Sequence, residues 1–400
     1  MTSKTIRDPI HGNISVSELE LSLIDTAEMQ RLRNIRQNGL CYLIYPAMNS
    51  TRFEHSLGVM HLAGILAERL GLNEQDKIKV RIAGLLHDIG HCALSHTSDS
   101  ILKSMGHSHE ENSVRIVMDS EISDILKDNG INPADISELI QGKGKFGNII
   151  SSEIDVDKMD YLIRDSYYAG VAYGVIDLER IIHGMMLMKN ELVIKKGSLE
   201  AVESLLISRN LMYQTVYRHH TKRIVEEMMK RAIATLIENG DITYEEFIRM
   251  DDIDLIHKLR TSDGYPRDIM SRIDRRDLFK IIFQERLELI DENFRKNLAI
   301  DKDKIEEKIR EDFGIENGYL LLDIPDTKLS EFRIKVEFDN ELKRIDEVSS
   351  LARALEKAEM EKLTICIYTS RENIKKFKDF NPERYIELSQ TRLNKFISVR

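Results

Sequence analysis

The sequence predicts a mainly α-helical core followed by a smaller α+β appendage. Only 6 of the 400 residues are proline, and many segments are rich in Leu, Ile, Met, Glu, Lys and Arg, which favour helices. After about residue 236 the charge density rises, and apolar, β-rich runs appear at 318–324, 332–338 and 363–369. A chain of this length exceeds what one compact domain usually holds. We therefore expect two domains, a core over residues 1–235 and an appendage over residues 236–400.

The elements of the core can be predicted in order along the chain. Residues 5–20 contain a Pro, a Gly and an apolar alternation, which is typical of a short extended segment. Asp25 and Thr26 are candidate helix caps. A short strand is expected at 191–197. Hydrophobic periodicity predicts helices over residues 22–37, 56–70, 77–87, 109–128, 153–168, 177–188, 199–238 and 271–294.

Composition and charge exclude several classes of protein. Hydrophobic residues make up 42% and charged residues 32% of the chain, as in folded proteins rather than disordered ones. The net charge of −10 argues against a nucleic-acid partner or an anionic membrane surface. No apolar stretch approaches the ~20 residues that span a bilayer. The N-terminus lacks the apolar core of a signal peptide, and three widely spaced cysteines do not form a disulfide framework, so we expect a cytoplasmic protein.

Histidine and aspartate residues gather in three short segments. Five of the 12 histidines fall between residues 87 and 109, and the string LLHDIGHCALSH follows a strongly apolar stretch. A single buried His–Asp pair is often only a satisfied hydrogen bond in a core. Here, however, TRFEHSLG lies upstream and SSEIDVDKMDYLIRD downstream. Two His and two Asp can complete a mixed N/O site for Mn, Fe, Co, Ni or Zn, or for Mg with more carboxylate character.

The segment after Asp157 carries a second pattern. Asp157, Tyr161 and Arg164 are spaced i, i+4 and i+7, so they share one face of a helix. A carboxylate, a phenol and a guanidinium in line could form the floor of a phosphate site. The alternative is an ordinary polar stripe with a surface ion pair.

Seven blocks in fixed order, across about residues 6–230, resemble the deoxynucleoside triphosphate triphosphohydrolases of the HD superfamily of metal-dependent phosphohydrolases. The blocks are IRDPIHGNI, IDTAEMQRLRNIRQNG, TRFEHSLGV, AGLLHDIGHCALSH, SHEENSV, IDVDKMDYLIRDSYYAGV and SRNLMYQTVYRHH. The resemblance implies an HD-domain helical core. Because the blocks begin at residue 6, no sterile-alpha-motif domain is expected ahead of them.

The resemblance also implies roles for individual residues. The metal ligands would be His55, His87, Asp88 and Asp157. The catalytic group beside the scissile phosphate would be His91 and His109, completed by His96 and Asp99. The substrate contacts would be Arg52, Gln37, Lys158, Tyr161, Arg164, Arg209 and Tyr217.

An activating nucleotide and a homo-oligomer, dimer or tetramer, are further partners that the resemblance implies. Asp25, Gln30 and Arg33 match positions that bind an activating nucleotide in regulated members of the family. Their alternative role is a helix cap with surface polar residues.

The expected activity is hydrolysis of a deoxynucleoside triphosphate to deoxynucleoside and inorganic triphosphate. Two alternatives stay open, another HD phosphohydrolase such as a nucleotidase or phosphodiesterase, and a non-catalytic nucleotide sensor. Asn38 stands where the family has an apolar residue, so the choice of base and sugar is left open.

Overall fold

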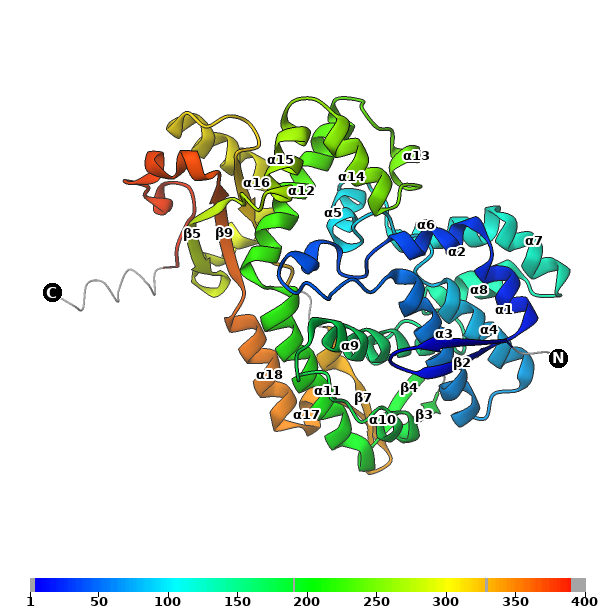
Figure 1. Cartoon of the computed structure of the whole chain (residues 1–400). Helices are drawn as coiled ribbons and strands as arrows, with labels where there is room; N and C mark the ends of the chain where they lie inside the picture. The colour runs from blue at the N-terminus through cyan, green and yellow to red at the C-terminus, as the bar shows by residue number, and fades with distance from the viewer. Residues whose placement is uncertain (1–3, 190, 328–329, 390–400) are drawn as a thin grey trace. The chain divides into compact units, whose positions relative to one another are not determined.

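The computed structural model describes residues 4–189, 191–327 and 330–389 and is mainly helical, as predicted (Figure 1). Its contacts divide the chain into two compact units. The first unit holds residues 1–218, 242–257 and 330–353, and the second holds residues 219–241, 258–329 and 354–400. Residues 242–257 and 330–353, which follow residue 235 in the sequence, therefore belong to the first unit by their contacts. The two domains expected on either side of residue 235 stay a prediction.

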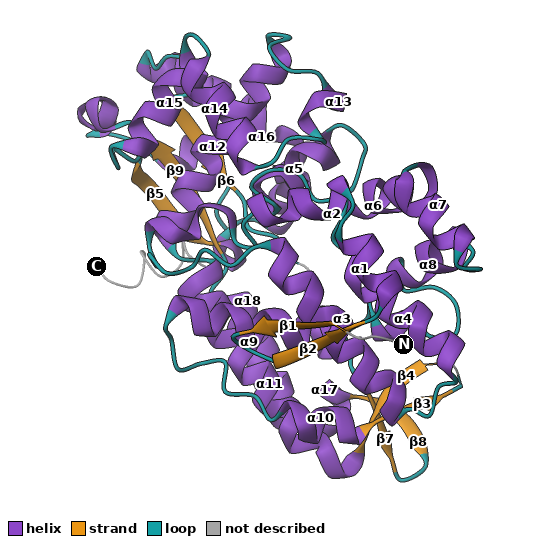
Figure 2. Cartoon of the chain, turned by 45° about the vertical axis from the view of Figure 1, so that its right-hand side comes forward, coloured by secondary structure: helices purple, strands orange, loops and turns teal. Residues whose placement is uncertain are grey.

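An N-terminal hairpin and a run of helices open the first unit. Antiparallel strands β1 (Lys4–Asp8) and β2 (Gly12–Val16) confirm the predicted extended segment, and β2 lies beside α3 (Figure 2). The helix expected over 22–37 is broken at Thr26, whose extended backbone separates two shorter helices. The helices of this part are α1 (Glu18–Ile24), α2 (Ala27–Arg31), α3 (Arg52–Arg69), α4 (Glu74–Leu86), α5 (His96–Ser104), α6 (His109–Asp119), α7 (Glu121–Asp128), α8 (Pro133–Ile140) and α9 (Val156–Ala169).

Helix α3 is the central element of the first unit. Its start is fixed by a capping box in which Thr51 accepts from the Glu54 backbone and Glu54 accepts from the Thr51 backbone. Most of its residues are buried, as expected for a helix surrounded by protein. It packs against α4 and α9. Helix α4 is followed directly by His87 and Asp88, and helix α9 carries Asp157.

The first unit also contains a four-stranded sheet. Its order is β3 (Met185–Met188), β4 (Glu191–Lys195), β7 (Lys335–Phe338) and β8 (Glu341–Arg344), and only the β4–β7 pair is parallel. The prediction of one helix over 177–188 is therefore wrong at its end: α10 (Leu178–Gly184) stops where β3 begins. Met185–Met188 instead pair with the predicted strand, so strand pairing overrides their helical propensity.

The predicted helix over 199–238 is also interrupted. Helix α11 (Leu199–Met212) runs into a π-helix, Tyr213–Tyr217, and α12 (His220–Glu238) starts anew in the second unit. The short helices α13 (Tyr244–Phe247) and α17 (Ile345–Val348) belong to the first unit. Helices α14 (Asp252–Thr261) and α18 (Ser350–Glu361) complete the order.

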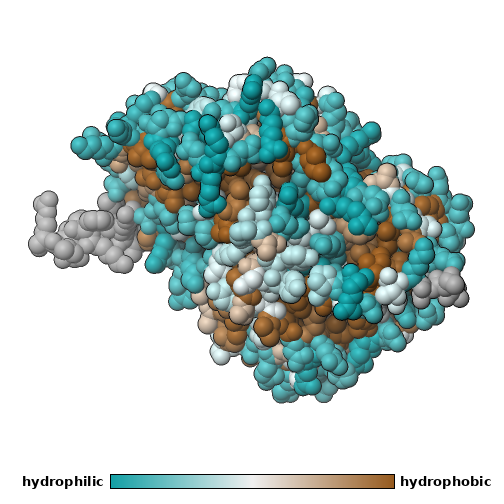
Figure 3. Space-filling view, in the orientation of Figure 1, coloured by the Kyte–Doolittle hydropathy of each residue, from teal (hydrophilic) through white to brown (hydrophobic). Residues whose placement is uncertain are grey.

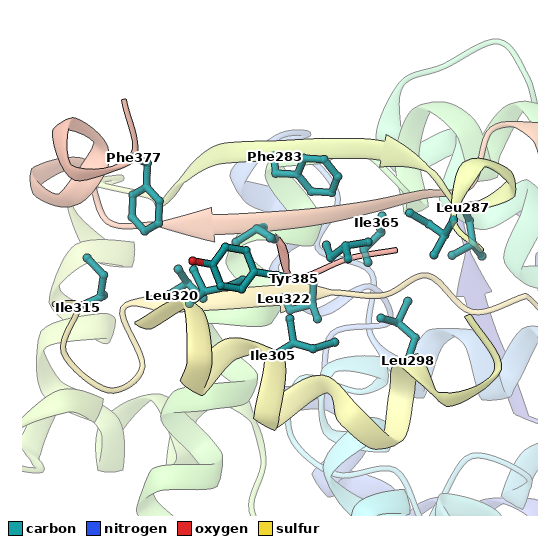
Figure 4. Close-up of a cluster of buried hydrophobic side chains, with 14 of the residues drawn as sticks. Phe283, Leu287, Leu298, Ile305, Ile315, Leu320, Leu322, Ile365, Phe377 and Tyr385 are labelled. Carbon is teal, nitrogen blue, oxygen red and sulfur yellow. The ribbon is translucent and has the colours of Figure 1, made fainter. Parts of the chain in front are cut away.

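The second unit is α+β. Antiparallel strands β5 (Lys280–Arg286), β9 (Thr364–Thr369) and β6 (Leu320–Asp323) form its sheet, which confirms two of the predicted β-rich runs. The helix expected over 271–294 is wrong, because strand β5 occupies its centre, between α15 (Tyr265–Asp274) and α16 (Glu292–Phe313). Figure 4 shows the core beneath the sheet, where Leu322 and Ile365 face side chains of α16 such as Ile305.

The molecular face in Figure 3 is largely hydrophilic, with separate apolar patches between the charged side chains. Within the part of the chain that the structure describes, no helix has both the length and the apolar character needed to cross a bilayer.

The core of the second unit predicts a stability effect. Ile367 on β9 is fully buried, so Ile367→Ala leaves a cavity and lowers the free energy of unfolding of this unit by about 2–5 kcal/mol. Ile281 on β5 is 37% exposed, and the same change there has a much smaller effect. Urea unfolding of both variants measures the difference. Equal losses would contradict the described packing.

Candidate active site

Four side chains that the sequence singled out as metal ligands come together in the first unit. His55 lies in the first turn of α3, His87 and Asp88 follow α4, and Asp157 lies in the first turn of α9. The His55 Nε2 atom is 2.9 Å from Asp157 Oδ1 and 3.5 Å from Asp88 Oδ2. The His87 Nε2 atom is 3.4 Å from Asp88 Oδ1 and 3.8 Å from Asp157 Oδ1. Two imidazoles and two carboxylates therefore point at one common position.

The donor atoms fit a divalent metal ion. Nε2 of His55 and Nε2 of His87 are buried and have no hydrogen-bond partner within the described residues, although such atoms are normally satisfied. The Nδ1 atoms already contact Asp160 at 2.7 Å and the Gly84 carbonyl at 2.8 Å. The Nε2 atoms thus face carboxylate oxygens, an arrangement that is favourable only when a cation, either a proton or a metal ion, lies between them. Imidazole and carboxylate ligands without thiolate suit a transition metal.

The four side chains His55, His87, Asp88 and Asp157, called the metal cluster below, shift one another's pKa values. Burial lowers the pKa of His55, but the nearby carboxylates of Asp157 and Asp160 outweigh it and raise this pKa to about 10. Burial alone would raise the pKa of Asp157, whereas contacts with His55 and His87 hold it well below its usual range. The cluster therefore attracts positive charge strongly.

Asp160 orients the His55 ring. This carboxylate is fully buried and accepts from His55 Nδ1, from His11 Nε2 at 2.6 Å and from two nitrogens of Arg164 at 2.8 and 2.9 Å. Arg164 in turn donates to Asp8 at 2.8 Å. A carboxylate on the far ring nitrogen fixes the tautomer that turns Nε2 toward a metal.

Helices α3 and α9 approach closely at this point because of Gly58. A Cβ atom at Gly58 would lie 1.9 Å from Asp160 Oδ1 and 2.5 Å from Arg164 Nη2. Glycine is thus required for the two helices to bring His55 and Asp160 into contact.

A second group of side chains lies next to the metal cluster. The rings of His91 and His109 are stacked with centroids 4.0 Å apart. Asp99 contacts both histidines: Nδ1 of His109 is 3.1 Å and Nδ1 of His91 is 3.6 Å from its Oδ1. His96, whose side chain is 58% exposed, is 3.5 Å from Asp99 Oδ2. The structure therefore brings together all four residues predicted as catalytic.

The two stacked histidines differ in their protonation. Burial, with Arg52 and His109 nearby, lowers the pKa of His91 to about 3. Burial also lowers the pKa of His109, but the hydrogen bond and charge of Asp99 outweigh it, so the net shift is upward. At neutral pH His91 is neutral, and His109 holds a proton more readily than an ordinary histidine.

Arg52 joins the two groups. Its guanidinium donates to Asp88 Oδ2 at 2.6 Å and to Ser95 Oγ at 3.0 Å, and its Nη2 is 3.3 Å from His96 Nε2. Because it is almost fully buried, this positive charge is felt by both the metal cluster and the histidine group.

Other residues that the sequence predicted to bind substrate make contacts with neighbouring protein groups. Lys158 donates to Asp155 and to the Ser152 carbonyl, both at 2.8 Å. Arg209 lies over the Tyr213 ring. The Tyr161 ring is 6.3 Å from that of Tyr217.

Two buried acceptors near these residues lack partners. The hydroxyl of Tyr217 donates to Asp165 Oδ2 at 2.7 Å, while Asp165 Oδ1 and Gln37 Oε1 are buried without a hydrogen-bond partner among the described residues. Asp165 received no role from the sequence, although it lies in the same block as Asp157, which the sequence predicted to bind metal.

The predicted contact between Arg164 and a triphosphate does not fit its position. The side chain has no exposed surface, and its guanidinium is taken up by Asp160 and Asp8. His11, to which the sequence analysis gave no role, also contacts Asp160. The i, i+4 spacing of Asp160 and Arg164 was the signal that could have revealed this ion pair.

The three residues predicted to bind an activating nucleotide lie around the α1–α2 corner. Asp25 ends α1 and is exposed. Gln30 accepts from Arg33 at 2.8 Å and donates to the Ile24 carbonyl, and Arg33 stacks on the Phe53 ring. Binding of a regulatory nucleotide here stays a prediction.

Family comparisons match both parts of the chain. Residues 52–165 match the family described as "HD domain", and residues 176–396 match the family described as "HD associated region". All four residues of the metal cluster lie in the first range.

Individual relatives cover most of the chain. An uncharacterised protein of Methanocaldococcus jannaschii is 39% identical over 94% of this chain and 82% of its own length. A Dictyostelium discoideum protein named deoxynucleoside triphosphate triphosphohydrolase SAMHD1 homolog is 32% identical over 70% of this chain and 60% of its own length. The crystal structure of a hypothetical protein from Aquifex aeolicus, 31% identical, superposes with a TM-score of 0.78, covering 94% of this chain and 100% of that one.

Loss of the Asp160 carboxylate is expected to weaken metal binding. Asp160→Asn keeps the side-chain volume but removes the charge that orients His55, so metal affinity should fall about 10–100-fold. Asp177→Asn, at an exposed helix cap, should leave it unchanged. Titration of both purified proteins with Mn²⁺ or Zn²⁺ against a competing chelator measures the affinity. Equal affinities in two folded variants would contradict this role of Asp160.

Proposed function

Since this chain belongs to the HD-domain phosphohydrolases, we propose that it hydrolyses deoxynucleoside triphosphates to the deoxynucleoside and inorganic triphosphate. One observation carries the proposal: the metal cluster of two His and two Asp lies next to a second group. In that group the rings of His91 and His109 are stacked, and Asp99 contacts both of them. The first suits activation of a phosphate, and the second suits delivery of a proton. The relative named for this same activity supports the choice of substrate.

Water attacks the α-phosphorus, and the bond between this phosphorus and the 5′ oxygen breaks. A divalent ion bound by the four ligands would polarise a phosphoryl oxygen or lower the pKa of water. The departing 5′ oxygen is a poor leaving group unless it is protonated. His109, whose pKa is raised by Asp99, supplies that proton, and neutral His91 packs against it without adding charge.

Binding of the substrate requires cations for the triphosphate and acceptors for the sugar. Arg52, Lys158 and Arg209 are proposed to contact phosphate oxygens, since guanidinium and ammonium groups bind them by charge-assisted hydrogen bonds. Tyr161, whose ring packs edge-on against that of Tyr217, is proposed to contact the substrate as well. The unpartnered acceptors Gln37 Oε1 and Asp165 Oδ1, with Tyr217, are proposed to face the sugar hydroxyl and base.

The two alternatives are weaker on chemical grounds. A nucleotidase or phosphodiesterase acting on one phosphate needs fewer cations than Arg52, Lys158 and Arg209 supply. A non-catalytic sensor needs no group for proton transfer, yet His109 and Asp99 are hydrogen-bonded to each other beside the metal cluster.

The products identify the reaction. The metal-loaded protein, incubated with each deoxynucleoside triphosphate singly and in pairs, is expected to yield triphosphate and deoxynucleoside on anion-exchange chromatography. His87→Ala and Asp88→Ala should abolish both products because each removes a metal ligand. Diphosphate or orthophosphate as the product would place the chemistry at another bond. Binding without turnover under every metal and pairing would make the protein a sensor.

The pH dependence of turnover tests the proton donor. A histidine acid works only when protonated, and its pKa is raised here, so kcat should hold at low pH and fall as pH rises through a value above 6.5. Asp99→Asn removes the charge that stabilises the imidazolium, so the falling limb should move to lower pH. His109→Gln should lower kcat and remove the limb. If His96→Gln removed the limb instead, His109 would not be the donor.

A further inference from the structure

The loop between His91 and His96 has a strained backbone. Leu94 and Ser95 have φ angles of 59° and 44°, in the left-handed region that residues with a Cβ rarely adopt. Both residues are buried. Such strain persists only where the surroundings hold it in place. The contacts of this loop therefore indicate what keeps His91, His96 and Asp99 in register.

Asp252 makes the most direct of these contacts. It is 1% exposed, and its Oδ1 accepts from the Leu94 backbone N–H at 2.7 Å. Its Oδ2 accepts from the Arg36 backbone N–H at 3.1 Å and from Arg36 Nη1 at 3.4 Å. One carboxylate oxygen thus binds the loop at Leu94, and the other binds the chain at Arg36. The carboxylate ties the strained residue to the chain that precedes α3.

Two further links hold the same loop. Arg31 donates to the carbonyls of Ile89 and His91 at 2.9 and 2.8 Å, and to the carbonyl of Met250 at 3.2 Å. Ser95 Oγ donates to the Arg36 carbonyl at 2.8 Å. The segment Met250–Asp252 therefore contacts the histidine loop directly through Asp252 and indirectly through Arg31.

We propose that Asp252 is a positioning residue for the catalytic loop. Asp252 lies within the residues matched by the HD-associated region and outside the matched HD domain. It touches neither the metal ligands nor the histidines. It acts by holding Leu94 in its left-handed conformation, which sets the direction in which the chain leaves His91 and begins α5 at His96.

Asp252→Asn changes this contact with little change in volume. The amide keeps one oxygen for the Leu94 N–H, but its nitrogen is a donor and faces the donors of Arg36. The side chain then no longer ties Leu94 to Arg36, so one of the three links that hold the loop is lost and the loop relaxes toward ordinary backbone angles. The cluster of His55, His87, Asp88 and Asp157 does not depend on this contact, so metal binding should be retained.

The test combines a structural and a kinetic readout on the full-length, metal-loaded protein. Hydrogen exchange of peptides covering residues 87–99 should become faster in Asp252→Asn than in the wild type, while exchange elsewhere and bound metal are unchanged. With deoxynucleoside triphosphate as substrate, kcat should fall about 10- to 100-fold at nearly constant KM. Asp254→Asn, which removes an exposed carboxylate two residues away, is the matched control and should behave as wild type.

The kinetic arm rests on the proposed function, whereas the exchange arm does not. Wild-type protein without turnover would refute the proposed function and leave exchange to decide the role of Asp252. Active Asp252→Asn with unchanged exchange over 87–99 would overturn the positioning role alone. If Asp252→Asn did not fold, Asp252→Glu would test the same contact, since it keeps the charge but moves the carboxylate away from the Leu94 N–H by one methylene. Unchanged exchange and kcat in that variant would likewise overturn the proposal.

Discussion

The buried ion pair between Asp160 and Arg164 is the interaction on which the site depends. The Asp160 carboxylate accepts from His55 and His11, and Arg164 carries the connection on to Asp8. The N-terminal hairpin, α3 and α9 are thereby joined through one fully buried carboxylate. Breaking such a pair from one side leaves an uncompensated charge in the interior, which is costly. The orientation of a metal-facing imidazole is thus tied to the folding of elements distant in sequence.

The charges around this pair explain why a cation belongs at the cluster. Arg164 is occupied by Asp160 and Asp8, and Arg52 is bonded to Asp88. Asp157 pairs with no arginine in the part of the chain that the structure describes and faces imidazole nitrogens. The arginines therefore support the ligands from behind and do not neutralise the position at which the ligands converge. An acidic chain with such a cluster can therefore bind a divalent cation through its own imidazole and carboxylate groups.

The residue types pointed to a His and Asp site, and the family resemblance selected the proposed metal ligands and catalytic residues, which the structure brings close together. His55, His87, Asp88 and Asp157 are unusual neighbours for apolar helices, so their residue types alone indicated a site. The sequence misplaced Arg164 because two spacings compete: i+7 from Asp157 and i+4 from Asp160 both lie on the same helix, and burial decided between them. Likewise, periodicity could not distinguish helix from strand at Met185–Met188, where pairing with a distant strand decides.

Asp252 shows a different limit of prediction. It lies 158 residues from Leu94 in the sequence, and nothing in its surroundings marks it as other than a helix-start carboxylate. Its importance follows from the backbone angles of the loop that it holds, and backbone strain has no signature in residue types when the strained residues are Leu and Ser. The ligands of this site are thus encoded locally, whereas their orientation is encoded by contacts distant in sequence. Because a proton donor must be held within a fraction of an ångström of its productive position, the proposed proton transfer would depend on these distant contacts as well as on the histidines.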